Sequence, residues 1–171
     1  QGRVVAVTMV AEEGGLSRQR CEAIRKGKVR ERGHALAETL ISHLGLPEAG
    51  SLRMMRSVRI AVHPAYRRRG LATRLIDAVH DAHRVDCWGT LFGVTPSLLS
   101  FRRSVGYELI RLGSARGSRS GEPSVVMMRP VTERAEAVFQ SARRDLARNL
   151  ELQIAQHHAE DGVGLGEALE A

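Results

Sequence analysis

The chain has 171 residues, of which 43% are hydrophobic and 26% are charged. This composition is typical of one soluble globular domain and excludes a collagen-like repeat or a wholly disordered chain. Its 26 basic residues outnumber its 19 acidic residues, so the formal net charge is +7 and we expect anionic partners. Only Lys26 and Lys28 are lysines, and the donor fork of the many arginines favours phosphate groups.

Cysteine usage and hydropathy narrow the class of protein further. Cys21 and Cys87 show neither a CxxC motif nor a zinc-site spacing, which favours a reducing, cytoplasmic compartment. No window has the length and hydropathy of a membrane span, and the first residues lack the features of a secretory signal. Because the chain starts at Gln1 instead of Met, we expect a piece of a longer protein. No metal site is predicted.

Hydrophobic periodicity and turn residues predict alternating strands and helices. The first half of the chain is predicted to contain a strand over Val4–Val10 that ends in a turn at Glu12–Gly15, a helix capped by Ser17, a basic stretch over Arg18–Arg32 and a helix over Ala35–Leu44. Next come a strand over Val58–Val62, a helix from Leu71 to about His83, a strand over Trp88–Val94 and a short helix through Ser104. The last predicted elements are a strand over Tyr107–Leu112, a loop over Ser114–Pro123, a strand over Ser124–Met128 and a long amphipathic helix after Pro130. The Gly-rich end from Gly162 is expected to fray.

The most informative motif joins the strand over Val58–Val62 to the helix that begins at Leu71. Arginines and Gly70 in this loop precede a helix start, where free backbone N–H groups can bind a pyrophosphate. Neither GxxxxGK[ST] nor GxGxxG occurs in the chain, so we expect no ATP hydrolysis by this chain alone. What remains is a Q/R-x-x-G-x-G/A pattern over Arg67–Ala72, for which an ordinary strand–helix turn is the structural alternative.

This pattern, the strand sequence over Arg59–Pro64 and the turn at Gly106-Tyr107 together resemble the GNAT acetyltransferases. The resemblance implies an α/β fold, in which a central mixed sheet with two splayed parallel strands is flanked by helices and followed by a long C-terminal helix. It also implies that acetyl-CoA binds in the gap between the splayed strands. The implied cofactor-binding residues are Ile60, Ala61 and Val62 along the pantetheine and thioester, and Arg67, Arg68, Arg69, Gly70, Leu71 and Ala72 around the pyrophosphate. The Val62 N–H is the expected donor to the thioester oxygen.

Three further motifs, over Glu13–Ser17, Arg32–His34 and Phe92–Thr95, resemble the acetyltransferase part of the bacterial tRNA(Met) cytidine acetyltransferase family. That resemblance implies acetylation of N4 of the wobble cytidine of elongator tRNA(Met). It also implies an ATP-hydrolysing module upstream and a tRNA-binding region downstream, both of which we expect outside this chain. We therefore divide the chain into an acetyltransferase core over residues 1–130 and a basic helix and tail over residues 131–171, which could begin the tRNA-binding region.

Candidate catalytic residues come from the same resemblance. His63 and His34 could take the proton of the acceptor amine as it attacks, although both could instead be ordinary polar residues at a strand end and a helix start. Many GNAT enzymes carry a tyrosine acid four residues before the Gly of the Gly-aromatic turn, and Arg102 occupies that place here. The general acid is therefore unassigned, and Arg102 could stabilise a thiolate, bind an RNA phosphate or be solvated. Tyr107 is expected in the core.

Residues for RNA binding are predicted from the basic stretch and from Arg102. They are Arg25, Lys26, Lys28, Arg30, Arg32 and Arg102. For the basic stretch, the structural alternative is a solvated helix face. The spacing of His80 and His83 could suit a metal ion, but the sequence offers no further ligands at a recognisable spacing, and a solvated helix face is the alternative here too.

Two other functions remain open at this point. One is a GNAT enzyme that acetylates a protein or small-molecule amine, which an acidic or aromatic amine pocket would favour. The other is an RNA-binding module that has lost catalysis, which tRNA binding without acetyl-CoA binding would support. Oligomeric state is not predicted.

Overall fold

The computed structural model describes residues 2–116 and 123–161. Its strands are β1 (Ala6–Gly14), β2 (Arg53–Val62), β3 (Cys87–Gly93), β4 (Glu108–Arg116) and β5 (Pro123–Pro130). Its helices are α1 (Arg18–Arg25), α2 (Ala35–Ser42), α3 (Leu71–Ala82), α4 (Pro96–Ser104) and α5 (Glu133–Asp161), with short 3-10 turns η1 (Pro47–Ser51) and η2 (Pro64–Tyr66). Across the described residues, no helix combines the length and the apolar character needed to span a membrane.

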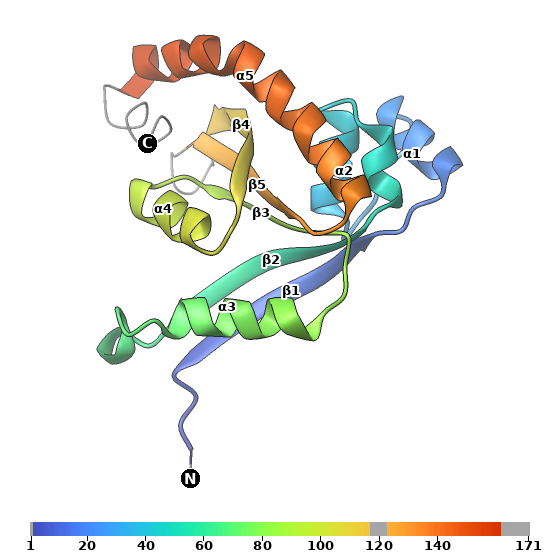
Figure 1. The fold of residues 1–171 in the computed structure, drawn as a ribbon. Coiled ribbons are helices and arrows are strands. Elements are labelled where there is room, and N and C mark those ends of the chain that lie inside the picture. The colour runs from blue at the N-terminus through green and yellow to red at the C-terminus, as the bar shows by residue number, and fades with distance from the viewer. Residues whose placement is uncertain (1, 117–122, 162–171) are drawn as a thin grey trace.

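The strands form one mixed sheet in the order β1-β2-β3-β5-β4 (Figure 1). Only β2 and β3 are parallel, because α3 provides the crossover between them, whereas the other neighbours are antiparallel. The predicted mixed α/β sheet with a long C-terminal helix is therefore confirmed.

Several boundaries differ from the predicted ones. The strand β1 continues through Glu12 and Glu13 to Gly14, because the Glu13 carboxylate has buried partners instead of lying in a solvated turn. The strand β2 begins five residues early, at Arg53, and β4 runs to Arg116, so the first residues of the predicted loop over 114–123 belong to a strand. The rest of that loop, residues 117–122, and the predicted frayed end from Gly162 lie outside the described residues.

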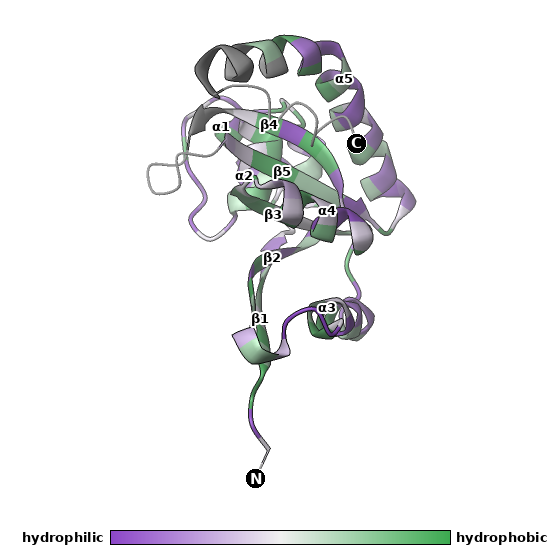
Figure 2. Ribbon diagram, turned by 90° about the vertical axis from the view of Figure 1, so that its left-hand side faces the viewer, coloured by the Kyte–Doolittle hydropathy of each residue, from purple (hydrophilic) through white to green (hydrophobic). Residues whose placement is uncertain are grey.

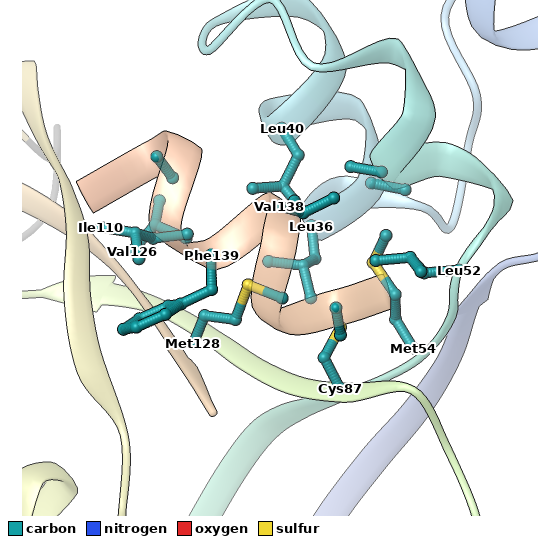
Figure 3. Packing of buried hydrophobic residues seen from close by; sticks show 14 residues of the cluster. Leu36, Leu40, Leu52, Met54, Cys87, Ile110, Val126, Met128, Val138 and Phe139 are labelled. Atoms are coloured by element: carbon teal, nitrogen blue, oxygen red, sulfur yellow. The ribbon is translucent and has the colours of Figure 1, made fainter. Parts of the chain in front are cut away.

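Apolar side chains pack on both faces of the sheet. On one face, residues of α2 and α5 such as Leu36 and Phe139 pack against Met54 and Met128 of the strands (Figure 3). On the other face, Ile76 of α3 and Leu99 of α4 pack with side chains that include Trp88. The apolar stripe at the start of α5 thus packs on the sheet of its own chain and completes the core.

The parallel strands separate after three residue pairs. The pairing of β2 with β3 ends at Arg56 and Gly89, yet β2 continues to Val62 alongside β1, and β3 continues to Gly93 alongside β5. Figure 1 shows α3 beside the β1–β2 arm and α4 beside the other arm. The implied splay between adjacent parallel strands is therefore present, and beyond Arg56 no strand of the described residues pairs with this edge of β2.

Candidate active site

The unpaired edge of β2 offers backbone groups to the gap. A bulge at Val58 shifts the register with β1. After the bulge, the carbonyl of Arg59 accepts from the Thr8 hydroxyl, and the N–H of His63 donates to the carbonyl of Val5, just before β1. Because successive residues of a strand face opposite edges, Ile60 and Val62 direct their N–H and C=O groups away from β1 and into the gap. An extended ligand can pair with these two residues as an added strand would.

The loop at the open end of the gap has the features of an anion site. Gly70 is left-handed (φ 69°) immediately before α3, and a Cβ built there would meet no atom within 4 Å, so the space beside it is open. Arg67, Arg68 and Arg69 are exposed, and Figure 2 shows this hydrophilic segment leading into α3. Free N–H groups in the first turn of α3 lie at the same place. The loop therefore presents positive charge and open space together.

Contacts of two of these arginines hold the loop against the strand end. The Arg69 guanidinium lies 5.3 Å from the centre of the Tyr66 ring, and the Nε of Arg67 donates to the Val62 carbonyl at 3.4 Å. Arg68 itself is left-handed, with φ 58°, which is uncommon for a residue with a side chain. Contacts among its own residues thus shape the loop.

His63 and His34 lie near opposite ends of β2, so the structure does not bring the two candidate bases together. His63 follows Val62, is exposed, and accepts the Ala65 N–H at Nδ1 (3.3 Å), which caps η2. At about 3.3 Å per residue, His63 is about 20 Å along the strand from Ser57, where the gap closes. This position argues against a role for His63 in proton transfer at the closed end.

His34 precedes α2 and is half-buried. Its Nδ1 accepts the N–H of Gly14 at 3.0 Å, and Gly14 pairs with Arg53 at the start of β2. A neutral imidazole that accepts at Nδ1 carries its proton at Nε2, so His34 presents a donor, not a base, at its free nitrogen. The arrangement suits a positioning role better than proton abstraction.

Arg102 is buried, which contradicts its prediction as an RNA-binding residue and rules out the alternative that it is solvated. Its side chain is part of the interior at 4% exposure, and Nη1 donates to the hydroxyl of Ser57 at 3.0 Å. A guanidinium enclosed in this way cannot reach an RNA phosphate at the surface, so we remove Arg102 from the set of RNA-binding residues. Its role must lie inside the fold, beside the point where the strands part.

The basic stretch after α1 is a surface feature. The predicted residues Arg25, Lys26, Lys28, Arg30 and Arg32 are all exposed. Arg25 pairs with Glu22 of the same helix at 3.0 Å, and no ion pair in the described part of the chain involves the other four. Their charges face solvent, where a phosphate backbone could reach them.

Sequence reasoning missed the buried carboxylate of Glu13. It accepts the N–H groups of Leu36 and Ala37 at the start of α2, at 2.7 and 3.3 Å, and pairs with the guanidinium of Arg56. One carboxylate therefore connects β1, β2 and α2, and it fixes the helix start next to His34. The two consecutive glutamates before the glycines suggested a solvated turn, and their spacing gave no sign of a buried pair.

A second missed feature is a network around His80, which was expected on a solvated face. His80 contacts the Tyr107 hydroxyl through Nε2 at 3.0 Å and Arg129 through Nδ1 at 3.2 Å, and it packs on Trp88. Burial, together with the positive charge of Arg129, lowers the pKa of His80 to about 4. Tyr107 lies in the core as expected, and burial raises its pKa to about 12.

A cavity of about 590 Å³ lies beside this network and is lined by residues that include Arg53, His80 and Trp88. Arg53 begins β2, so the cavity lies at the opposite end of that strand from the loop with Gly70.

Comparison with known families and structures agrees with this geometry. The model of the acetyltransferase (GNAT) domain matches residues 10–109, and the chain belongs to this family. The polyamine N-acetyltransferase of Drosophila melanogaster has a similar fold, with a TM-score of 0.52 and 18% identity over 77% of this chain and 71% of that one.

Curated relatives point to one branch of the family. The tRNA(Met) cytidine acetyltransferase TmcA of Nitrosococcus halophilus is 36% identical over 158 residues, which cover 91% of this chain and 21% of that protein. The enzyme of the same name from Haloarcula marismortui is 39% identical over 140 residues, covering 81% of this chain and 18% of the relative. The chain thus spans about a fifth of the length of these relatives.

Proposed function

We propose that this chain is the acetyl-transferring part of a tRNA(Met) cytidine acetyltransferase that uses acetyl-CoA to acetylate N4 of the wobble cytidine. The observation that carries the proposal is the gap between β2 and β3, with backbone groups of Ile60 and Val62 facing it along one side and a basic glycine loop at its mouth. The family match and the similarity to TmcA enzymes support the acceptor.

Residues already described fit acetyl-CoA, which supplies an activated acetyl thioester. The backbone groups of Ile60 and Val62 would pair with its extended arm, and the loop from Arg67 to Ala72 would hold its phosphates. Because the phosphates belong at the open mouth, the thioester belongs toward the closed end. We therefore propose that the Ile60 N–H donates the hydrogen bond to the thioester oxygen, because it is nearer the closed end than the Val62 N–H.

The remaining chemistry is mainly alignment. A thioester is already reactive, so a backbone donor that polarises its carbonyl and a cleft that holds the acceptor amine in reach can supply most of the rate enhancement. The amine loses its proton as it attacks, and with His63 distant and His34 protonated at its free nitrogen, we assign that proton to water in the open cleft.

We further propose that the exposed basic stretch over Arg25–Arg32 contacts the tRNA backbone and that residues 131–171 lead into a tRNA-binding region. Arginine and lysine supply the phosphate contacts that dominate the affinity for nucleic acids. ATP would act only through a module outside this chain, and the cytoplasm is the compartment in which such an enzyme meets tRNA.

The first experiment is a calorimetric titration of acetyl-CoA into the chain and into its Gly70→Glu variant. The added side chain places a carboxylate in the open space by the loop at a left-handed position, so we expect the affinity to fall at least tenfold. Arg84→Gln, an exposed change beyond the end of α3, serves as the control and should bind normally. Equal affinity of the Gly70→Glu variant would contradict the cofactor site.

The acceptor is tested separately with the whole gene. Deleting it should abolish N4-acetylcytidine at the wobble position of elongator tRNA(Met), as measured by mass spectrometry of the purified tRNA. Persistence of that modification, together with loss of acetylation on a protein or small amine, would favour the alternative acceptor. Binding of tRNA by a chain that does not bind acetyl-CoA would favour an RNA-binding module without catalysis.

A further inference from the structure

Arg102 is the only arginine among the described residues whose side chain is almost fully buried. It extends from α4 to β2, where Nη1 donates to the Ser57 hydroxyl at 3.0 Å. Its Nε is equally buried and has no hydrogen-bond partner within the described part of the chain. A buried donor that lacks an acceptor is costly, so this N–H is available to a ligand that supplies one.

The charge of Arg102 is also uncompensated. No carboxylate among the described residues forms an ion pair with it, and its guanidinium carbon lies 5.8 Å and 5.6 Å from the ring centres of Phe101 and Tyr107. Burial lowers the pKa of Arg102, but a guanidinium keeps its proton in proteins. A cation in this setting costs free energy unless an anion joins it at some stage of function.

The position of Arg102 identifies the kind of anion. Ser57 is the first residue of β2 beyond the parallel pairs, and Thr90 of β3 donates to its carbonyl at 3.1 Å, which closes the gap. The basic loop at the mouth follows the end of β2 at Val62, which lies about 17 Å farther along the strand, at about 3.3 Å per residue. The phosphates of CoA belong at that mouth, so the group left at the closed end is its sulfur.

We propose that Arg102 is the group that stabilises the CoA thiolate as it leaves, with Ser57 orienting the guanidinium. The inference rests on the proposed acetyl-CoA site and adds to it. As the acceptor nitrogen bonds to the acetyl carbon, the carbon–sulfur bond breaks, and its electron pair stays on sulfur beside the cation. The proton of the amine passes to water, so the products are the acetylated amine, the thiolate and one proton. No general acid is then required at this place.

The test measures the ionisation of CoA bound to the chain, which needs no acceptor. The thiolate absorbance of the complex is followed from about pH 6 to about pH 10, against protein alone; an ordinary thiol titrates near 8.5. The thiol of Cys87 does not interfere, because burial raises its pKa to about 12. We expect the pKa of bound CoA to be lower than that of free CoA by about one unit or more, as a cation within 4–6 Å produces.

Variants separate charge from structure. Arg102→Gln should return the bound thiol to its free value, whereas Arg102→Lys, which keeps the charge, should retain part of the shift. Arg103→Gln removes one charge from the same helix at a more exposed position and should keep the whole shift. Thermal melting and acetyl-CoA titration of each variant identify any that unfold.

The outcomes are distinct for the two proposals. Failure of the unaltered chain to bind CoA would overturn both the acetyl-CoA site and the role of Arg102. Binding with an unshifted thiol would overturn the role of Arg102 alone, and so would a folded Arg102→Gln variant that keeps the shift. Because an unshifted thiol in the unaltered chain would by itself overturn the role of Arg102, the proposal stays falsifiable even if every Arg102 variant misfolds.

Discussion

Glu13 carries a charge into the interior, and three groups on two other elements depend on it. Replacing it by Gln removes the charge that Arg56 pairs with and weakens the acceptor for the start of α2, so we expect the free energy of unfolding to fall by about 2–4 kcal/mol. Urea unfolding measures the loss. The adjacent Glu12, whose side chain is 57% exposed and pairs with Arg53, is the matched control. Glu12→Gln should cost less than about 1 kcal/mol, and similar losses in both variants would contradict the buried role of Glu13.

His80 gives the molecule a pH dependence of stability. Its pKa is about 4 in the folded chain, against 6.5 for an unperturbed histidine, so below about pH 6.5 the unfolded chain binds a proton that the folded chain does not. Stability therefore falls as the pH drops from about 6.5 toward 4. Allowing for the partial exposure of the ring, we expect a loss of about 1–2 kcal/mol at pH 5.

Urea unfolding at pH 7 and pH 5 measures this loss, and the His80→Gln variant should reduce the difference between the two pH values. His83→Gln, an exposed change three residues later, should keep the difference that the unaltered chain shows. If the His80→Gln variant has the full pH dependence, other groups are responsible for it.

Among the elements, the segment after α1 carries the clearest prediction about RNA. Replacing Lys28 and Arg30 by Gln removes two exposed charges, so the slope of log affinity for tRNA against log salt should become shallower by about two. Affinity for acetyl-CoA should not change, because the altered residues belong to a different element from the gap and the loop. Filter binding at several salt concentrations measures the slope, and Arg84→Gln is again the control. Equal losses of tRNA and acetyl-CoA binding would contradict a separate RNA surface.

Strands and helices that depend on local pattern were predictable from the sequence. The periodic apolar residues of α3 predicted the bounds of that helix to within about one residue. The cap at Ser17 predicted the start of α1, and Ser17 does accept the Arg20 N–H. The first residues of β2 were missed because both faces of the strand are buried there. Met54 and Met55 lie in the two different core clusters, so polar and apolar residues do not alternate along this segment.

The candidate site was predictable only where it is local. The glycine loop before α3 is one continuous segment, so its pattern is visible in the sequence. The cluster of Ser57, Thr90 and Arg102 comes from three elements, and nothing in the spacing of these residues indicates that they meet. For the same reason the burial of Arg102 was not foreseen, since an arginine is rarely enclosed.

At the scale of the whole molecule, the question is whether α5 is a separate unit. Phe139 and Ala142 of this helix lie in the same buried cluster as Leu36 and Met128. We therefore expect one cooperative unfolding transition, which Phe139→Ala should shift as a whole by about 3–5 kcal/mol. Denaturation followed by circular dichroism and by Trp88 fluorescence tests this. Two separate transitions would instead support a boundary near residue 130.

The separation of β2 from β3 has a consequence for the molecule without its cofactor. Strand edges with free backbone groups are templates for pairing with other chains, and natural sheets usually cover or charge them. If acetyl-CoA binds along this edge, as we propose, the edge cannot be covered permanently and is protected only while the ligand is bound. The enzyme would then be most prone to self-association when acetyl-CoA is scarce, and the supply of its acetyl donor would govern its colloidal stability as well as its turnover.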